Sequence, residues 1–284
     1  MEKDARTFVL LFQCQDTKGI VAKIAQCIFG RNANIISLDQ YSSDPYGGDF
    51  FMRVEFFAED EAVTGATLEA DFSRIAAELK AEFRLYEKTK LLRMGILVSK
   101  LDHCLLDILY LWRSGELKVQ IPFIASNCET NRRIAAEYNI PFHYVMASRE
   151  DRKEQEVLSL ARANSDFLVL ARYMLVFSPE FLKSYGKDII NIHHGFLPSF
   201  KGAHPYRQAL EKGVKVIGAT AHFVSDTLDD GPIITQAVRE VSHKETLADL
   251  VHKGKNLEKK ALSEALQAYI DHRVIKHKDK TIVF

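Results

Sequence analysis

The sequence predicts an α/β protein with two domains, a ferredoxin-like βαββαβ domain followed by a doubly wound domain with a mostly parallel sheet. The first prediction rests on residues 1–87, where apolar segments follow the order strand, helix, strand, strand, helix, strand. The second rests on residues 94–284, where short apolar strands alternate with amphipathic helices. Residues 88–93 (KTKLLR) are expected to form a linker, and a chain of 284 residues has room for about two domains.

Each element of the first domain follows from hydrophobic periodicity or from a turn signal. Residues 7–14 (TFVLLFQC) are mostly apolar, which is typical of a buried strand. The turn at 16–19 opens a helix whose isoleucines recur at helical spacing through about residue 32. A Pro-Tyr-Gly-Gly turn at 45–48 indicates a hairpin. The remaining predicted elements are strands at 34–40, 49–57 and 83–87 and a helix at 67–81.

The second domain is predicted by the repeated change between strand and helix periodicity. The expected strands are 94–98, 119–126, 167–171 and 189–193, and the expected helices are 104–114, 129–138, 149–163 and 180–185. After residue 193 come a turn-rich loop, a short helix, and an apolar strand that ends in an acidic turn. Ligands of such sheets bind beyond the carboxyl ends of the strands, so a site is expected near residue 191.

Composition and charge argue against several classes of protein. Basic and acidic residues both number 38, so no basic surplus draws the chain to nucleic acid or to an anionic membrane. The N-terminal sequence lacks the shape of a signal peptide, and no apolar run is long enough to span a bilayer. The four cysteines are widely spaced, which indicates reduced thiols rather than disulfides or a zinc site. We therefore expect a cytoplasmic protein without a metal.

Three polar side chains near one strand end suit one-carbon acyl chemistry. Asn191 and His193 are two residues apart on a strand, so they point to the same side while Ile192 points into the core. A carboxamide can hold a carbonyl oxygen as charge builds on it, and an imidazole can transfer a proton near neutral pH. Asp229 lies in an acidic turn that can fold back over the strand end. A carboxylate there can orient the histidine or accept a proton from water.

Other interpretations of these residues stay open at this point. Covalent catalysis has no support in a Gly-x-Ser-x-Gly elbow or in a recognisable nucleophilic cysteine. A metal site made of His193, His194 and Asp229 or Asp230 is conceivable, but no His-x-x-x-His or Cys-x-x-Cys motif completes it. Alternatively, His193 and Asp229 are simply a strand-end histidine and a turn aspartate.

The segment 191–232 resembles the folate-dependent formyltransferase family. It has Asn-x-His at 191–193, Leu-Pro…Gly at 197–202 and Asp-x-Leu-Asp-x-Gly-Pro at 226–232, in that family's order. The resemblance covers residues 94–284 and implies that Asn191, His193 and Asp229 are catalytic and that 10-formyltetrahydrofolate is the one-carbon donor. It also implies that the apolar segment 170–177 forms a wall for the pterin. The substrate-binding residues implied in this way are Met174, Leu175, Val176, His194, Gly202 and Asp226.

Two features indicate water rather than an amine as the acceptor of the formyl group. The loop at 98–104 has no glycine to cradle a substrate phosphate, unlike the amine-accepting ribonucleotide member of the family. The N-terminal domain resembles an ACT domain, a module that commonly binds amino acids. The combination resembles the hydrolytic members of the family, which implies hydrolysis of 10-formyltetrahydrofolate to formate and tetrahydrofolate, in one-carbon metabolism and purine biosynthesis, without a cofactor. The alternatives are a formyltransferase with an amine acceptor and a non-catalytic folate or amino-acid sensor.

The sequence departs from the family pattern in two places. The resemblance to an ACT domain also implies regulation by a small ligand. Gly195 stands where a serine is usual and His204 where an asparagine is usual, which bears on the acceptor side of the pocket. By analogy with ACT domains, Asp16 and Gly19 are candidates to contact an amino-acid effector such as methionine or glycine, although a helix-start turn explains both without a ligand. The open four-stranded sheet leaves edges that favour a homo-oligomer.

Overall fold

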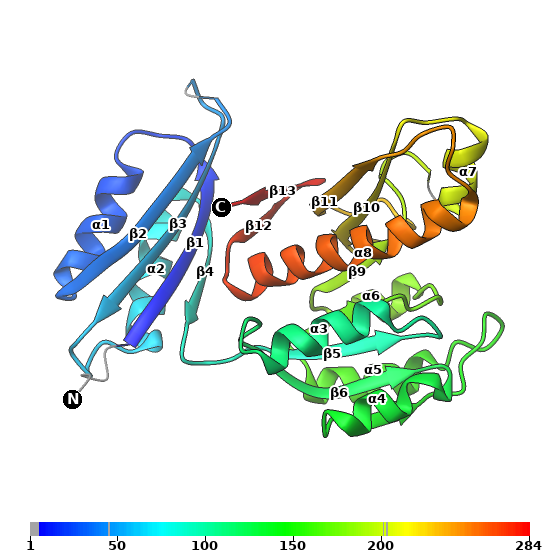
Figure 1. Ribbon diagram of the computed structural model, residues 1–284. Helices are drawn as coiled ribbons and strands as arrows, with labels where there is room; N and C mark the ends of the chain where they lie inside the picture. Colours follow the sequence, from blue (N-terminus) through cyan, green and yellow to red (C-terminus); the bar gives the residue numbers. More distant parts are fainter. Residues whose placement is uncertain (1–5, 45, 201, 203) are drawn as a thin grey trace. The chain divides into compact units, whose positions relative to one another are not determined.

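The chain divides into two compact units in the computed structural model, which describes residues 6–44, 46–200, 202 and 204–284 (Figure 1). The first unit contains the chain up to Leu91 together with Asp271–Ile275 and Ile282–Phe284, and the second contains Leu92–Ile270 and Lys276–Thr281. Pro45, expected in a hairpin turn, lies outside the described residues. No helix in the described part of the chain is long and apolar enough to cross a bilayer.

The first unit is an antiparallel sheet of four strands with two helices, and it has the predicted βαββαβ order. Its elements are β1 (Arg6–Gln15), α1 (Ile20–Gly30), β2 (Ala33–Ser42), β3 (Asp49–Ala58), α2 (Gly65–Leu79) and β4 (Glu82–Glu87). The strands lie in the order β2-β3-β1-β4. α1 begins after Gly19, whose φ of 92° favours glycine, and α2 begins with Thr64, whose side chain caps the N–H of Thr67.

Both faces of the central strand β1 are covered, which explains the unbroken apolar run at residues 8–12 within it. Leu10 points into the core under the two helices, whereas its neighbour Leu11 points to the opposite face and packs with Ile275. The sequence predicts that the whole segment 94–284 belongs to the second domain. The structure instead includes Asp271–Ile275 and Ile282–Phe284 in the first unit, because the second apolar face of its sheet needs cover.

The second unit is a sheet of seven strands with helices on both faces. Its strands are β5 (Arg93–Val98), β6 (Gln120–Ser126), β7 (Phe142–Tyr144), β8 (Phe167–Leu170), β9 (Ile189–His193), β10 (Val216–Phe223) and β11 (Ile233–Glu240). Its α-helices are α3 (His103–Arg113), α4 (Arg132–Glu137), α5 (Glu154–Asn164), α6 (Pro179–Tyr185), α7 (Pro205–Glu211) and α8 (Leu247–Ile270). A hairpin of β12 (Val274–His277) and β13 (Lys280–Val283) ends the chain.

The strand order of the larger sheet fixes where a ligand can bind. The order is β11-β10-β9-β8-β5-β6-β7, with parallel pairing from β9 to β7 and antiparallel pairing of β10 with both of its neighbours. After β5 the chain adds strands on one side through β7 and then returns to the other side at β8. Helix α5 packs on β5 and β6, whereas α8 packs on β9, β10 and β11 and against α3 (Figure 1). Sheets of this kind bind ligands beyond the carboxyl ends of their strands near such a switch. The cavity in this structure lies next to it, at the ends of β8, β9 and β10.

The structure differs from the expected elements at several places in the second unit. Helix α5 begins at Glu154 rather than at 149, because the hydroxyl of Ser148 accepts backbone N–H groups of the next turn and competes with the helix. The helix expected at 129–138 begins as a 3₁₀ turn and becomes α4 only at Arg132. Strands β7 and β11, helix α8 and the hairpin β12–β13 were not predicted.

Candidate active site

The carboxyl end of β9 carries the polar residues that the sequence singled out. Asn191 and His193 leave the strand on one side, and Ile192 between them is buried. Strand β10 pairs antiparallel with β9, and the register sets His222 opposite Asn191 and Thr220 opposite His193. The end of β9 therefore receives polar side chains from the neighbouring strand as well.

Asp229 reaches His193 from the loop between β10 and β11. Its Oδ2 lies 3.3 Å from Nδ1 of His193 and accepts the N–H of Gly202 at 3.3 Å. The other ring nitrogen of His193, Nε2, lies 3.2 Å from the carbonyl oxygen of Phe200. A ring with one N–H satisfies one of these two acceptors, whereas the doubly protonated ring satisfies both. The geometry allows His193 and Asp229 to exchange a proton.

Burial and nearby histidines act in opposite directions on the pKa of Asp229. Its side chain is 8% exposed, and burial by itself would raise the pKa of the carboxyl group. The hydrogen bond and charge of His193 and the N–H of Gly202 outweigh burial and hold the pKa of Asp229 below its ordinary value. The carboxylate is therefore ionised at neutral pH and available as a proton acceptor.

His222 belongs to this cluster and was not among the residues predicted from the sequence. Its Nε2 lies 3.2 Å from the side-chain nitrogen of Asn191 and 3.9 Å from Oδ1 of Asp229. Its Nδ1 lies 2.9 Å from the carbonyl oxygen of Phe223, so an Nδ1–H donates there and leaves Nε2 to accept from the Asn191 amide. Burial lowers the pKa of His222, which favours this neutral ring. The one available signal was a histidine within an apolar strand.

Side-chain hydrogen bonds fix the turn after β9 to the neighbouring strands. The hydroxyl of Thr220 donates to the carbonyl of Gly195 at 2.9 Å and accepts the N–H of Leu197 at 3.1 Å. The amide of Gln236 donates to the carbonyl of Leu197 at 2.8 Å. A Cβ at position 195 would lie 2.8 Å from Nε2 of His193. The glycine at this position therefore leaves the His193 ring space that a larger residue would restrict.

Asn191, His193 and Asp229 line one cavity of about 410 Å³. This volume lies within the range of about 300–1,000 Å³ that is usual for small-molecule sites. The cavity is also lined by the residues expected to bind substrate, namely Met174, Leu175, Val176, His194, Gly202 and Asp226. After β8, Met174 and Val176 are half exposed, whereas Leu175 packs into the hydrophobic core. This segment is therefore a cavity wall with alternating outward and inward side chains.

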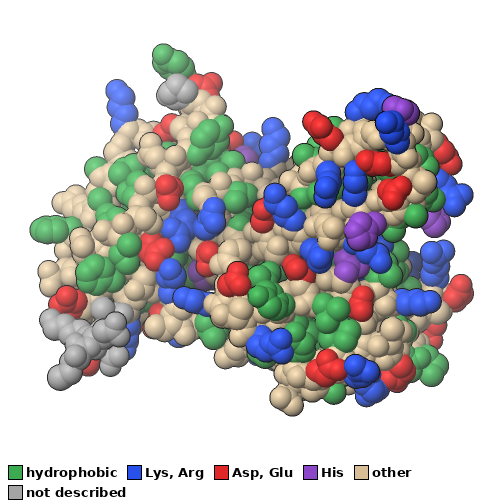
Figure 2. Space-filling view, viewed as in Figure 1, with side chains coloured by type: hydrophobic (Ala, Val, Ile, Leu, Met, Phe, Trp, Pro, Cys, Tyr) green, Lys and Arg blue, Asp and Glu red, His purple; other side chains and the backbone are tan. Residues whose placement is uncertain are grey.

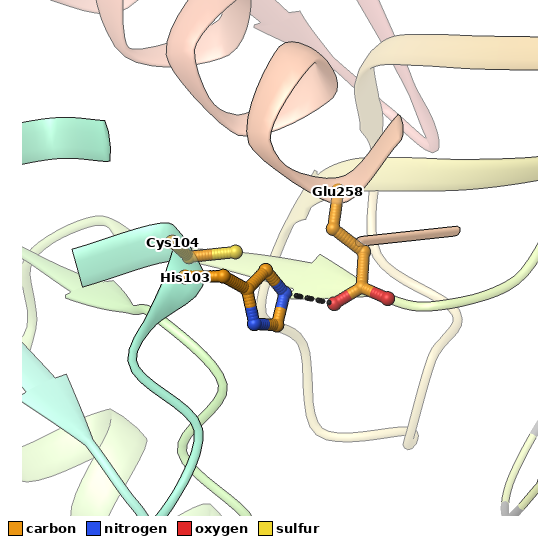
Figure 3. Close-up of side chains that lie close together, drawn as sticks. All are labelled: His103, Cys104 and Glu258. Atoms are coloured by element: carbon orange, nitrogen blue, oxygen red, sulfur yellow. Dashed lines mark hydrogen bonds and ion pairs between the residues drawn. The ribbon is translucent and has the colours of Figure 1, made fainter. Parts of the chain in front are cut away.

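A buried ionic cluster adjoins the cavity through Arg172. Glu258 of α8 is 2% exposed, and its carboxylate lies 2.8 Å from Nε2 of His103, 3.3 Å from Nε of Arg172 and 3.0 Å from the Tyr206 hydroxyl. Figure 3 shows His103 and Cys104, at the start of α3, and Glu258 pointing toward one another. Burial would raise the pKa of Glu258, but the hydrogen bond from His103 and the charge of Arg172 lower it below its ordinary value.

The same cluster has a composition that metal ions use. Donor atoms of His103, Cys104 and Glu258 lie within 4.8 Å of one another. Metal binding requires the thiolate of a cysteine, but burial and the charge of Glu258 raise the pKa of the Cys104 thiol well above its ordinary value. Arg172 also already balances the charge of Glu258. The cluster therefore suits a structural role better than a metal site.

Comparison with known proteins identifies the family. The formyl transferase family profile matches residues 92–266, and the ACT domain profile matches residues 8–72. A formyltetrahydrofolate deformylase from Bacillus subtilis is 41% identical to this chain, and the match covers 97% of this chain and 93% of that protein. A mitochondrial formyltetrahydrofolate deformylase from Arabidopsis thaliana is 42% identical, and the match covers 97% of this chain and 88% of that protein. A formyltetrahydrofolate deformylase structure from Pseudomonas syringae has a TM-score of 0.94 at 38% identity, with 98% of this chain and 94% of that chain covered. The chain belongs to the formyltetrahydrofolate deformylase family.

Membership of the formyltetrahydrofolate deformylase family agrees with the predicted combination of an ACT domain and a formyltransferase fold. In the ACT domain, Asp16 and Gly19 line a second cavity of about 350 Å³ at the start of α1. The hydroxyl of Ser42 donates to the Asp16 carboxylate, so this carboxylate is held in place. On the face seen in Figure 2, basic and acidic side chains are interspersed.

Proposed function

We propose that this protein hydrolyses 10-formyltetrahydrofolate to formate and tetrahydrofolate. The observation that carries the proposal is the His193–Asp229 pair, with 3.3 Å between Nδ1 and Oδ2, which faces the same cavity as Asn191. The names of the relatives in the deformylase family support the same reaction. The proposal needs no metal or cofactor, because the folate derivative is itself the substrate.

The cavity offers complementary surfaces for the folate. Met174 and Val176, with Leu175 packed in the core between them, form an apolar wall that suits the flat pterin ring. Asp226, which lines the same cavity, offers a carboxylate to the amino and N–H donors of the pterin. Gly202 has no side chain to obstruct the substrate, and its φ of 83° favours glycine. We assign these residues to substrate binding on this chemistry.

The reaction we infer uses Asn191, His193 and Asp229 in complementary roles. Asn191 and His193 hold the formyl oxygen, and Asp229 accepts a proton from the attacking water. Negative charge then collects on the formyl oxygen, where the Asn191 amide stabilises it together with the Nε2–H of protonated His193, on which the formyl oxygen takes the place of the Phe200 carbonyl. Collapse of the tetrahedral intermediate releases N10, which takes a proton from Asp229 or His193, directly or through water.

The test is hydrolysis in the absence of any amine. Purified protein is incubated with 10-formyltetrahydrofolate while formate and tetrahydrofolate are both measured. Asp229→Asn is nearly isosteric, so we expect its fold to persist and its turnover to fall by at least about 100-fold, because the proton acceptor is lost. Asp230→Asn is the matched control: the adjacent carboxylate is exposed, and the variant should hydrolyse at close to the wild-type rate.

The possible outcomes separate the competing functions. Release of both products by wild type and Asp230→Asn, and its loss in Asp229→Asn, would support the proposal. Consumption of substrate only after an amine is added would make the protein a formyltransferase instead. Equal rates for wild type and Asp229→Asn would contradict the assignment of Asp229.

We also infer that the first unit binds a small amino acid at the cavity lined by Asp16 and Gly19, and that the protein acts as a homo-oligomer in the cytoplasm. Methionine and glycine are the candidate effectors. Their effect is measured as a change in the hydrolysis rate of wild type, and Asp16→Asn should weaken it. Light scattering of the purified protein tests the homo-oligomer.

A further inference from the structure

His194 is a polar side chain without a protein partner beside the catalytic residues. Its ring centroid lies 5.4 Å from that of His193 and 6.0 Å from that of Tyr206. Among the residues that the structure describes, none makes a hydrogen bond to either ring nitrogen of His194, and the residue lines the active-site cavity. The side chain is half-buried, and the open side of the ring is the cavity that it lines. The partner of this ring is therefore expected among the molecules that enter the cavity.

We propose that His194 holds the water molecule that attacks the formyl carbon. This inference rests on the proposed hydrolysis and names the residue that binds its nucleophile. His194 directly follows His193, which we place on the formyl oxygen, and it lines the same cavity as Asp229, the proton acceptor. A water molecule bound to His194 would therefore lie close to both the electrophile and the base.

The neutral state of the His194 ring suits this role. Burial and the charge of Arg172 lower the pKa of His194 to about 3, so the ring is uncharged at physiological pH. A neutral imidazole has one N–H donor and one acceptor nitrogen, whereas an imidazolium has only donors. The acceptor nitrogen of His194 can take one O–H of the water. The lone pair of the water oxygen is then left for the formyl carbon.

The second O–H of the water faces Asp229, and its proton passes to that carboxylate as the oxygen bonds to the formyl carbon. The carbonyl π electrons move onto the formyl oxygen, which Asn191 and His193 hold. The carbon–N10 bond then breaks, N10 takes up one proton, and tetrahydrofolate leaves. The formic acid that remains loses its proton to solvent and becomes formate.

The buried cluster around Glu258 supports the position of the His194 ring. Tyr206 packs edge-on against His194 at an interplanar angle of 71°, and its hydroxyl donates to Glu258 at 3.0 Å. Glu258 also holds Arg172, which lines the cavity, at 3.3 Å. Because both neighbours are anchored by the same buried carboxylate, the ring has a fixed wall behind it. A fixed ring positions water better than a mobile one.

The test compares two substitutions of His194 with an exposed histidine on α8. Initial rates over a range of 10-formyltetrahydrofolate concentrations are measured for His194→Ala, His194→Gln and the control His252→Ala. We expect His194→Ala to lower kcat by about 100-fold while KM changes little, because the ring binds water rather than folate. His194→Gln should keep more activity, since its amide oxygen can accept from water. Free imidazole should restore part of the rate of His194→Ala.

Each outcome decides the inference separately from the proposed function. Hydrolysis by wild type and His252→Ala establishes the reaction whatever His194 does. A kcat of His194→Ala within about threefold of wild type, or a loss confined to KM, would overturn the inference. It would also be overturned if neither imidazole nor the glutamine variant restored any rate, because a structural role alone would then account for the loss.

Discussion

Neutralising Glu258 removes the one carboxylate that holds the buried cluster of the second unit together. The Glu258 side chain is 3% exposed and that of Arg172 is 8% exposed, so neither charge is solvated by bulk water. Removing one partner of a buried ion pair costs about 3–5 kcal/mol, because the other charge is left uncompensated. Glu258→Gln keeps an acceptor for the Tyr206 hydroxyl. We therefore expect its cost to lie near the lower limit, at about 3 kcal/mol.

The assay uses the single tryptophan of the chain. Trp112 lies on α3 in the second unit, and its indole N–H donates to the carbonyl of Val119 at 2.9 Å, so its fluorescence reports the unfolding of this unit. With a urea m value of about 2–3 kcal/mol/M, a loss of about 3 kcal/mol lowers the unfolding midpoint by about 1–1.5 M.

The matched control lies on the same helix. Glu264 pairs with Lys260 at 3.9 Å, and the two side chains are 50% and 65% exposed. Such a pair contributes no more than about 0.5 kcal/mol, so Glu264→Gln should leave the midpoint almost unchanged. Equal midpoints for Glu258→Gln and Glu264→Gln would refute the reasoning, because burial of the ion pair would then have no measurable consequence.

Two further predictions concern packing and pH. A Cβ at Gly254 would lie 2.1 Å from Cζ of the buried Tyr206 ring, whereas a Cβ at Gly65 meets nothing within 4 Å. Gly254→Ala should therefore lower the thermal midpoint by about 4–8 °C, and Gly65→Ala should leave it unchanged or raise it; equal shifts would contradict the predicted clash. Burial lowers the pKa of His194 to about 3 and that of His272 to about 4, so the unfolded chain binds protons near pH 6.5 that the folded chain does not. Stability should be full above pH 6.5 and fall by about 2 kcal/mol per histidine at pH 5. The free energy of unfolding is measured in urea above pH 6.5 and at pH 5. It should fall less for His272→Gln than for wild type between these two conditions, and an equal fall would count against this explanation.

The sequence by itself determined the two-domain α/β fold and the main catalytic candidates. Strand and helix periods are local properties, so βαββαβ order and the later strand–helix alternation can be read without tertiary information. The two-residue period of a strand placed Asn191 and His193 on one side, as the structure has them. Asp229 was found because its acidic turn follows an apolar strand and matches a family motif. In the structure this turn folds back over the end of β9, and Asp229 contacts His193 at 3.3 Å.

Only the tertiary structure decided which distant residues complete the site. His222 meets Asn191 because β10 runs antiparallel to β9 in one register, and no local period encodes a register between strands. Glu258 is 155 residues from His103 in sequence, and the two meet because α8 packs against α3. The C-terminal segment around Ile275 lies in the first unit because an apolar face of its sheet needs cover. These contacts depend on which surfaces remain to be buried once local elements have formed, which is a property of the whole chain.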